Sequence, residues 1–178
     1  MKPLYDHLYL SPHFDDAALS CGGQIATLTA AEQSVLVVTI TGGDPPADAP
    51  SDTVQQLHER WAASLLAEGQ SGDAAVMVAQ RRAEDRAALA VLGAEWLHLS
   101  FLDCIYRCGP DDRALYPGPV DMFGPPNPDD DGTLAALAEA LADLPPAGRV
   151  YLPLGVGGHV DHLATRRAAE RVFAAPLY

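Results

Sequence analysis

Two short segments of the sequence combine imidazoles with carboxylates in a pattern that could bind a metal ion. In the first, one histidine and two aspartates fall within four residues, at His13, Asp15 and Asp16. In the second, two histidines lie three residues apart, at His159 and His162. A catalytic zinc typically takes three protein ligands from histidine and carboxylate and leaves one position for water. His13, Asp16 and His162 would supply that set, which would leave Asp15 and His159 for proton transfer.

Each segment alone has a simpler interpretation. A single histidine after a strand often makes only a structural hydrogen bond, and adjacent aspartates such as Asp15 and Asp16 can cap a helix N-terminus. The run His159-Val160-Asp161-His162 could be an exposed helix start. The two segments together are harder to explain in this way, because both are predicted to follow a strand of the same sheet.

The elements that must position these residues alternate between short apolar runs and helical patterns. Residues 35–40 form a continuous, largely apolar run rich in β-branched side chains, of the kind that is buried on both faces. Such alternation predicts an α/β fold with a mostly parallel sheet flanked by helices. Ligands bind beyond the carboxyl ends of the strands in such sheets, which is where both histidine segments and Asp103 are expected.

The predicted strands are 8–10, 35–40, 96–101 and 149–154, and the predicted helices are 15–31, 53–68, 83–92, 133–144 and 161–173, with a long loop over 103–130.

Composition and charge narrow the classes of partner. The 178 residues carry 24 acidic and 11 basic side chains, for a net charge of −13, which repels nucleic-acid phosphates and anionic lipid. We therefore expect neither a nucleic acid nor a membrane as a partner. The start lacks a signal-peptide pattern, and no apolar run approaches the roughly 18 residues of a membrane span. Three cysteines do not make a disulfide framework, so a cytoplasmic protein with reduced thiols is expected.

Several of these residues also resemble a known family. Pro12-His13-Phe14-Asp15-Asp16 is similar to the proline-histidine-proline-aspartate-aspartate signature of the LmbE/PIG-L zinc deacetylases, although Phe14 replaces the second proline. His159-Val160-Asp161-His162 resembles the second histidine motif of that family. Arg81 and Glu84, with Leu92-Gly93, resemble its arginine-x-x-glutamate helix. The resemblance extends from residue 8 to about residue 173.

This resemblance implies a Rossmann-like three-layer fold, formed by a single domain over residues 1–178. It implies a zinc ion held by His13, Asp16 and His162, and hydrolysis of the N-acetyl group of an N-acetylglucosamine derivative. The expected partner is thus a small N-acetylated molecule, and a homo-oligomer stays open. Family members commonly continue past the last helix, so a substrate-contacting element is expected beyond Tyr178 or from a neighbouring subunit.

The resemblance also implies roles around the metal. Asp15 would be the general base, and His159 would polarise the carbonyl or protonate the leaving group. His159 would then act with a pKa above its free value of about 6.5, raised by a neighbour such as Asp161. Asp161 would orient one imidazole. Arg81 could reach the substrate or pair along its own helix, and Asp103 could bind a sugar hydroxyl or serve only in a turn.

Two other functions stay open at this point. A zinc amidase acting on a different small amide would keep the same metal ligands and differ only in its pocket. A non-catalytic Rossmann-like ligand-binding module would use the carboxylates only as helix caps. Zinc content separates the module from the enzymes, and a substrate screen separates the two enzymes.

Overall fold

The computed structural model describes residues 5–48, 51–65 and 73–178. Its strands and α-helices follow one another in the predicted alternation. In chain order they are β1 (Tyr5–Ser11), α1 (Asp16–Ala30), β2 (Val35–Thr39), α2 (Asp52–Leu65), α3 (Ala74–Val91), β3 (Glu95–His98), α4 (Asp131–Ala142), β4 (Ala147–Tyr151) and α5 (Val160–Val172). The end of the predicted helix 53–68, from residue 66 onward, lies outside the described residues.

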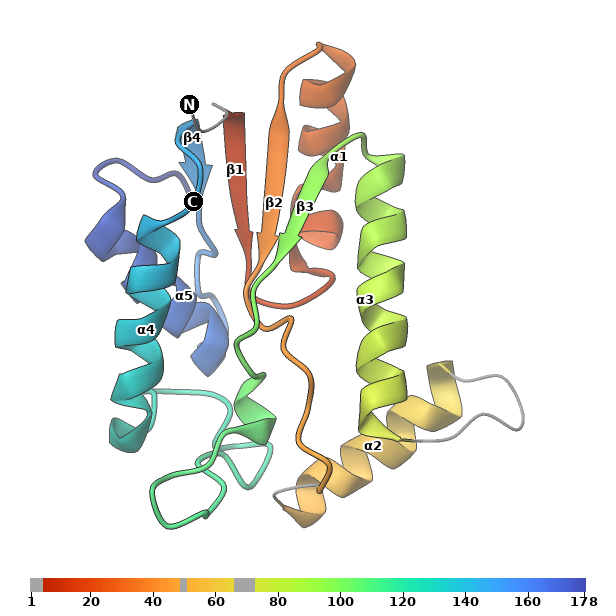
Figure 1. Cartoon of the computed structure of the whole chain (residues 1–178), viewed down its shortest axis with the longest axis vertical. Coiled ribbons are helices and arrows are strands. Elements are labelled where there is room, and N and C mark those ends of the chain that lie inside the picture. The colour runs from red at the N-terminus through yellow and green to blue at the C-terminus, as the bar shows by residue number, and fades with distance from the viewer. Residues whose placement is uncertain (1–4, 49–50, 66–72) are drawn as a thin grey trace.

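The strands form one sheet in the order β3-β2-β1-β4, and each of its ladders is parallel. Helices α1 and α3 cover one face, and α4 and α5 cover the other (Figure 1). This arrangement confirms the predicted three-layer α/β fold. The chain leaves β1 towards β2 on one side and later adds β4 on the other side. The carboxyl ends of β1 and β4 therefore flank the switch point at which open α/β sheets bind ligands.

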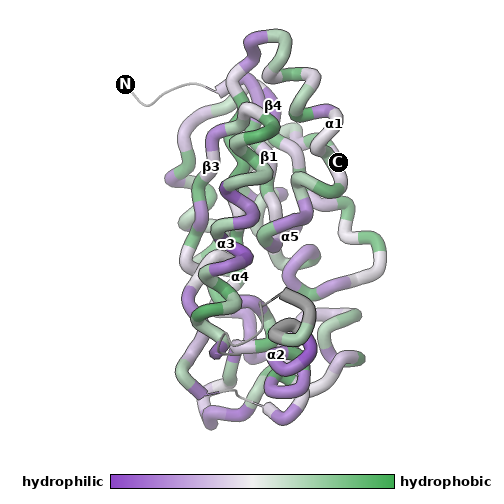
Figure 2. Tube along the Cα trace, turned by 90° about the vertical axis from the view of Figure 1, so that its right-hand side faces the viewer, coloured by the Kyte–Doolittle hydropathy of each residue, from purple (hydrophilic) through white to green (hydrophobic). Residues whose placement is uncertain are grey.

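Side chains that alternate along the strands build two apolar cores, one on each face of the sheet. The core beneath α4 and α5 includes Leu8, Leu36, Val38, Leu137, Leu141 and Ala168. The core beneath α1 and α3 includes Tyr9, Val35, Val37, Ile25 and Leu89. In Figure 2, where the trace is coloured by hydropathy, β1 and β4 lie towards one end of the molecule and α2 lies towards the other. Burial on both faces explains why residues 35–40 read as a continuous apolar run.

The structure corrects several predicted boundaries. Helix α3 begins at Ala74 rather than at residue 83, because the Asp73 carboxylate accepts a hydrogen bond from the backbone N–H of Ala75 and caps the first turn. Strands β3 and β4 end at His98 and Tyr151, three residues earlier than predicted in each case. The residues that follow these two strands run towards the edge of the sheet where the histidines gather.

The segment 103–130 is a long connection, as predicted, but it is not without structure. It contains two single-turn 3₁₀ helices, Cys104–Tyr106 and Pro128–Asp130. It also carries its own buried apolar cluster, which packs against Val54 of α2 and Val160 of α5. The loop is thus anchored to the same helix that carries His162. Among the described residues, no helix is both long and apolar enough to cross a membrane.

Candidate metal centre and active site

The turn after β1 is closed by its own side chains. The Ser11 hydroxyl donates to the backbone oxygen of His13 at 2.7 Å and accepts from the backbone N–H of Ala17 at 3.0 Å. The backbone N–H of His13 donates to Asp16 Oδ2 at 2.9 Å. These bonds place the His13 ring and the Asp16 carboxylate side by side at the N-terminus of α1. A serine, a histidine and an aspartate at this spacing thus form the turn locally.

The second histidine segment follows β4 and starts α5. His159 occupies the N-cap position, and its Nδ1 accepts from the backbone N–H of Asp161 at 3.3 Å. The backbone N–H of Val160 donates to the Met122 carbonyl at 2.9 Å, which ties this helix start to the long loop. His162 lies one turn into α5 and faces the turn after β1.

The ligand atoms of the three predicted ligands lie close together. Asp16 Oδ2 lies 3.2 Å from His13 Nδ1 and 3.2 Å from His162 Nε2. The ligand atoms of these three residues all lie within 4.8 Å of one another. A tetrahedral zinc with ligand distances of about 2.1 Å would hold its ligand atoms roughly 3.4 Å apart. The donor types and their spacing therefore fit a small divalent cation bound between β1 and β4.

The other nitrogen of the His13 ring faces a buried carboxylate. His13 Nε2 lies 3.1 Å from Asp161 Oδ2, and the same oxygen accepts from the backbone N–H of Cys104 at 3.1 Å. Asp161 is only 2% exposed. A carboxylate on the far nitrogen of a metal-ligating histidine fixes which nitrogen carries the proton. The prediction that Asp161 orients an imidazole is therefore matched by a contact, and the imidazole is that of His13.

Opposite charges dominate the electrostatics of this cluster. Burial disfavours a charged His13 ring, but hydrogen bonds to Asp16 and Asp161 outweigh burial and raise its pKa to about 10. Burial would raise the pKa of Asp16, but its bonds to His13 and His162 lower it below the ordinary 3.8. The pKa of Asp161 is likewise lowered, because its contacts with His13 and Arg107 outweigh burial. Both carboxylates are thus ionised, and that of Asp16 faces the proposed metal position.

His159 differs from the prediction. Burial, followed by the positive charge of His13, lowers the pKa of His159 below 6.5. The expectation of a raised pKa is wrong, because the Asp161 carboxylate turns towards His13 and offers His159 only its backbone N–H. Since Nδ1 of His159 accepts that N–H, the neutral ring carries its proton on Nε2. The neutral His159 ring can therefore donate a hydrogen bond from Nε2–H.

Asp15 lies outside the cluster of ligand atoms and lines a separate hollow with Arg81 and Glu84. Its side chain is 57% exposed, and Oδ1 lies 3.7 Å from Arg81 NH2. Asp15 occupies the N-cap position of α1, yet its carboxylate makes no capping hydrogen bond. Helix capping therefore does not account for this carboxylate. Arg81 turns towards Asp15 and the Phe14 ring, whose centroid is 5.8 Å from its guanidinium carbon, so it faces the site.

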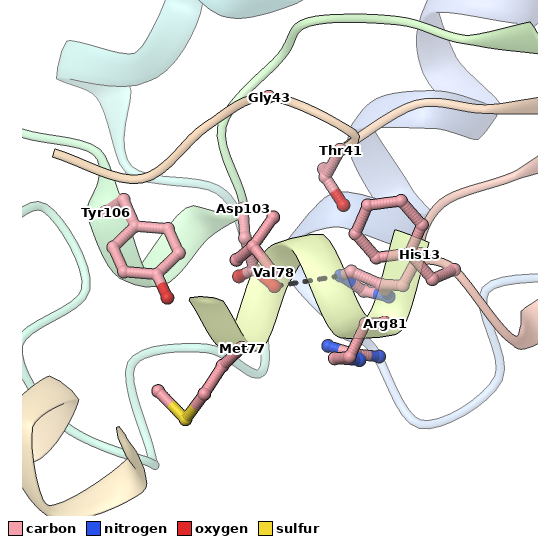
Figure 3. Close-up of a pocket in the computed structure, with 9 residues that line it drawn as sticks. His13, Thr41, Gly43, Met77, Val78, Arg81, Asp103 and Tyr106 are labelled. Carbon is pink, nitrogen blue, oxygen red and sulfur yellow. Dashed lines mark ion pairs between the residues drawn. The ribbon is translucent and has the colours of Figure 1, made fainter. Parts of the chain in front are cut away.

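A small cavity opens beside the His13 ring (Figure 3). Its volume is about 20 Å³, which is enough for a single water. It is lined by His13, Phe14, Thr41, Gly43, Met77, Val78, Arg81, Asp103 and Tyr106. Asp103 makes the turn contact considered from sequence, since its Oδ1 accepts from the backbone N–H of Ile105, and its Oδ2 points to His13 Nε2 at 3.8 Å (Figure 3).

The ligand set also borders a larger cavity of about 330 Å³. Asp16 and His162 line it, together with apolar side chains that include Leu152 and Leu154. His13 thus lines the small cavity, whereas Asp16 and His162 line the larger one. Both cavities are at the carboxyl edge of the sheet.

Several residues of the site carry no signal in the sequence. Tyr106 lines the small cavity, and His58 Nε2 lies 2.8 Å from its hydroxyl, although His58 is 48 residues away in the chain. Arg107 contacts Asp161 from the long loop at 2.6 Å. Neither residue belongs to a motif or a periodic pattern. The remaining histidines, His7 and His98, are bonded to Gln33 and Asp85 inside the fold, in agreement with a structural role.

Comparisons with known proteins find relatives that match most of the chain. The model of the GlcNAc-PI de-N-acetylase (PIG-L) family matches residues 8–173. The 2'-N-acetylparomamine deacetylase of Niallia circulans is 28% identical over 171 residues, which are 94% of this chain and 62% of that protein. The enzyme of the same name from Streptomyces fradiae is 30% identical over 164 residues, 92% of this chain and 50% of that protein.

A solved structure shows the same fold. The zinc-inhibited form of teicoplanin deacetylase Orf2 superposes with a TM-score of 0.75 and 34% sequence identity, over 93% of this chain and 62% of that protein. The chain thus spans about half to two thirds of the length of the proteins it matches.

Proposed function

The chain belongs to the GlcNAc-PI de-N-acetylase (PIG-L) family, and from this premise we propose that it is a zinc-dependent hydrolase that removes the N-acetyl group from an N-acetylglucosamine-type amino sugar derivative. The observation that carries the proposal is the close approach of His13 Nδ1, Asp16 Oδ2 and His162 Nε2, with the exposed carboxylate of Asp15 next to Asp16 in the chain. The names of the matched proteins, deacetylases of 2'-N-acetylparomamine and of teicoplanin, support an N-acetylated small molecule as the substrate.

His13, Asp16 and His162 would hold the metal. Zinc in this position supplies Lewis acidity, which activates water and polarises an amide carbonyl. Two neutral nitrogens and one carboxylate are the donor set of a catalytic rather than a structural zinc site, because a position stays open to water or substrate. The donor set also suits related divalent ions, so metal analysis must accompany any activity measurement.

Asp15 is proposed as the general base. Its exposed carboxylate can accept a proton from the attacking water and deliver one to the leaving amine. Arg81, which contacts this carboxylate at 3.7 Å, also lines the small cavity beside His13. Arg81 and Asp103, which both line the small cavity beside His13, are proposed to hydrogen-bond polar groups of the substrate.

His159 is proposed to stabilise the oxyanion. With Nδ1 accepting the backbone N–H of Asp161, the neutral ring offers Nε2–H as a donor. A neutral donor of fixed tautomer can act on developing negative charge without a proton transfer of its own. Asp161 is proposed to orient the His13 ring through its contact with Nε2, the nitrogen that does not face the metal position.

Metal analysis combined with acetate release tests the proposal. The protein should bind about one Zn²⁺ per chain and release acetate from one or more N-acetyl amino sugars, and Asp16→Asn and His162→Ala should lose the metal. Asp44→Asn, which alters an exposed carboxylate after β2, is the matched control and should keep it. Release of acyl groups only from other amides would favour a general zinc amidase. Absence of metal binding by the wild type would refute the metal centre.

A further inference from the structure

The long loop 103–130 reaches the metal centre through one buried arginine. Arg107 is 8% exposed and lies immediately after the 3₁₀ turn Cys104–Tyr106. Its NH2 is 2.6 Å from Asp161 Oδ1 and 3.1 Å from Asp130 Oδ2, so one guanidinium bridges two buried carboxylates. Arg107 NH2 and Asp161 Oδ1 lie outside hydrogen-bond angles, which makes their contact an ion pair.

The guanidinium itself is held from several directions. Its NH1 donates to the Leu102 carbonyl at 3.2 Å, and its central carbon lies 5.4 Å from the centroid of the Tyr116 ring. The Tyr116 hydroxyl donates to Asp130 Oδ2 at 2.8 Å. Both ends of the long loop, near residues 107 and 130, therefore meet at the same cation. A side chain so enclosed has little freedom to leave its position.

The two oxygens of Asp161 are divided between the loop and the metal centre. Oδ1 faces Arg107, and Oδ2 accepts from the backbone N–H of Cys104 and contacts His13 Nε2. Rotation of this carboxylate would break contacts at both oxygens at once. The ring of His13 is thereby kept with Nε2 towards Asp161 and Nδ1 towards Asp16.

We propose that Arg107 is a positioning residue of the metal centre, which acts through Asp161 to hold His13 with Nδ1 directed at the metal. The proposal rests on the zinc centre proposed above and adds a residue that does not touch it. Partners of this kind fix the tautomer and orientation of a ligating histidine, and their loss typically weakens metal affinity or activity by about 10- to 100-fold.

The test measures metal affinity rather than turnover. Metal-free protein is titrated with Zn²⁺ against a chelating dye and with Co²⁺ by visible absorption, for the wild type, Arg107→Met, Asp161→Asn and the double variant. Arg107→Met and Asp161→Asn should each weaken Zn²⁺ binding by about 10- to 100-fold and alter the Co²⁺ spectrum. Because Arg107 acts through Asp161, the double variant should bind little worse than Asp161→Asn alone. Arg113→Met alters an exposed arginine of the same loop and should bind like the wild type.

Unfolding is measured in parallel, because Arg107→Met leaves two buried carboxylates without their cation. A purely structural arginine would lower the midpoint of thermal unfolding and leave the Zn²⁺ dissociation constant of the folded protein unchanged. If Arg107→Met does not fold, Arg107→Lys carries the test: it keeps the charge, lacks the planar fork, and should weaken binding measurably.

Unchanged Zn²⁺ affinity in folded Arg107→Met, or in Arg107→Lys if the first variant does not fold, overturns the proposal, as does full additivity in the double variant. A wild type that binds Zn²⁺ but deacetylates no amino sugar would refute the proposed function and leave this result standing.

Discussion

Replacement of Asp15 by asparagine separates catalysis from metal binding. The asparagine keeps the shape of the side chain and removes its basicity. Asp15 lies outside the set of ligand atoms around Asp16 Oδ2, so metal content should be unchanged. Its ion pair with Arg81 is 3.7 Å long and its side chain is 57% exposed, so the free energy of unfolding should change by less than about 1 kcal/mol. Turnover should fall by about 10²- to 10⁴-fold, the usual contribution of a positioned general base.

Three measurements on one preparation decide the matter: Zn²⁺ per chain, urea unfolding, and the rate of acetate release at saturating substrate. Asp44→Asn is a close control, because Asp44 also follows a strand, is exposed and pairs with an arginine, Arg82, at 2.7 Å. The control should turn over at the wild-type rate. An Asp15→Asn protein with wild-type turnover would show that another group is the base, and one that had lost its zinc would show that Asp15 is a ligand.

Other perturbations test the fold around the site. Leu137→Ala removes a side chain that is 2% exposed, and urea unfolding should show a loss of about 2–5 kcal/mol. Gly43→Ala would place a Cβ 2.5 Å from the Ser100 carbonyl oxygen; we expect a loss of roughly 1–3 kcal/mol by the same measurement and slower acetate release. Burial lowers the pKa of His58 below 6.5, so the unfolded chain takes up the proton first as the pH falls. The free energy of unfolding should therefore decrease from about pH 6.5 downward, and His58→Gln, in denaturant titrations at pH 7 and pH 5, should show a smaller decrease.

The elements of the sheet could be predicted because burial on two faces leaves a clear pattern. Residues 35–40 are apolar except for Thr39, and the strand they predict is fully buried as β2. The start of α3 could not be predicted in this way. Residues 74–82 mix alanine and valine with polar side chains, and the helix begins where it does because of a single cap at Asp73.

The proximity of His13, Asp16 and His162 could be predicted for a similar reason. His13 and Asp16 follow β1, and His162 lies at the start of the helix that follows β4; the carboxyl ends of parallel strands share one edge. The roles of Asp161 and Arg107, which contact these residues or each other, could not be predicted. Asp161 stands between two histidines in the sequence, and only the packed side chains show that its carboxylate serves His13. Arg107 lies in a segment without periodicity, whose course depends on its own apolar cluster.

The balance of charge around His13 explains why a cation suits this place. Asp16 and Asp161 are both ionised and contact opposite nitrogens of the same ring. Arg107 compensates Asp161, so Asp16 needs a second positive charge, which a proton on His13 can supply. A divalent ion between His13 Nδ1, Asp16 and His162 would replace that proton and leave the contact between His13 and Asp161 in place. Metal binding should then require little movement of the chain, because the protein already holds the three ligand atoms at about the spacing the ion needs.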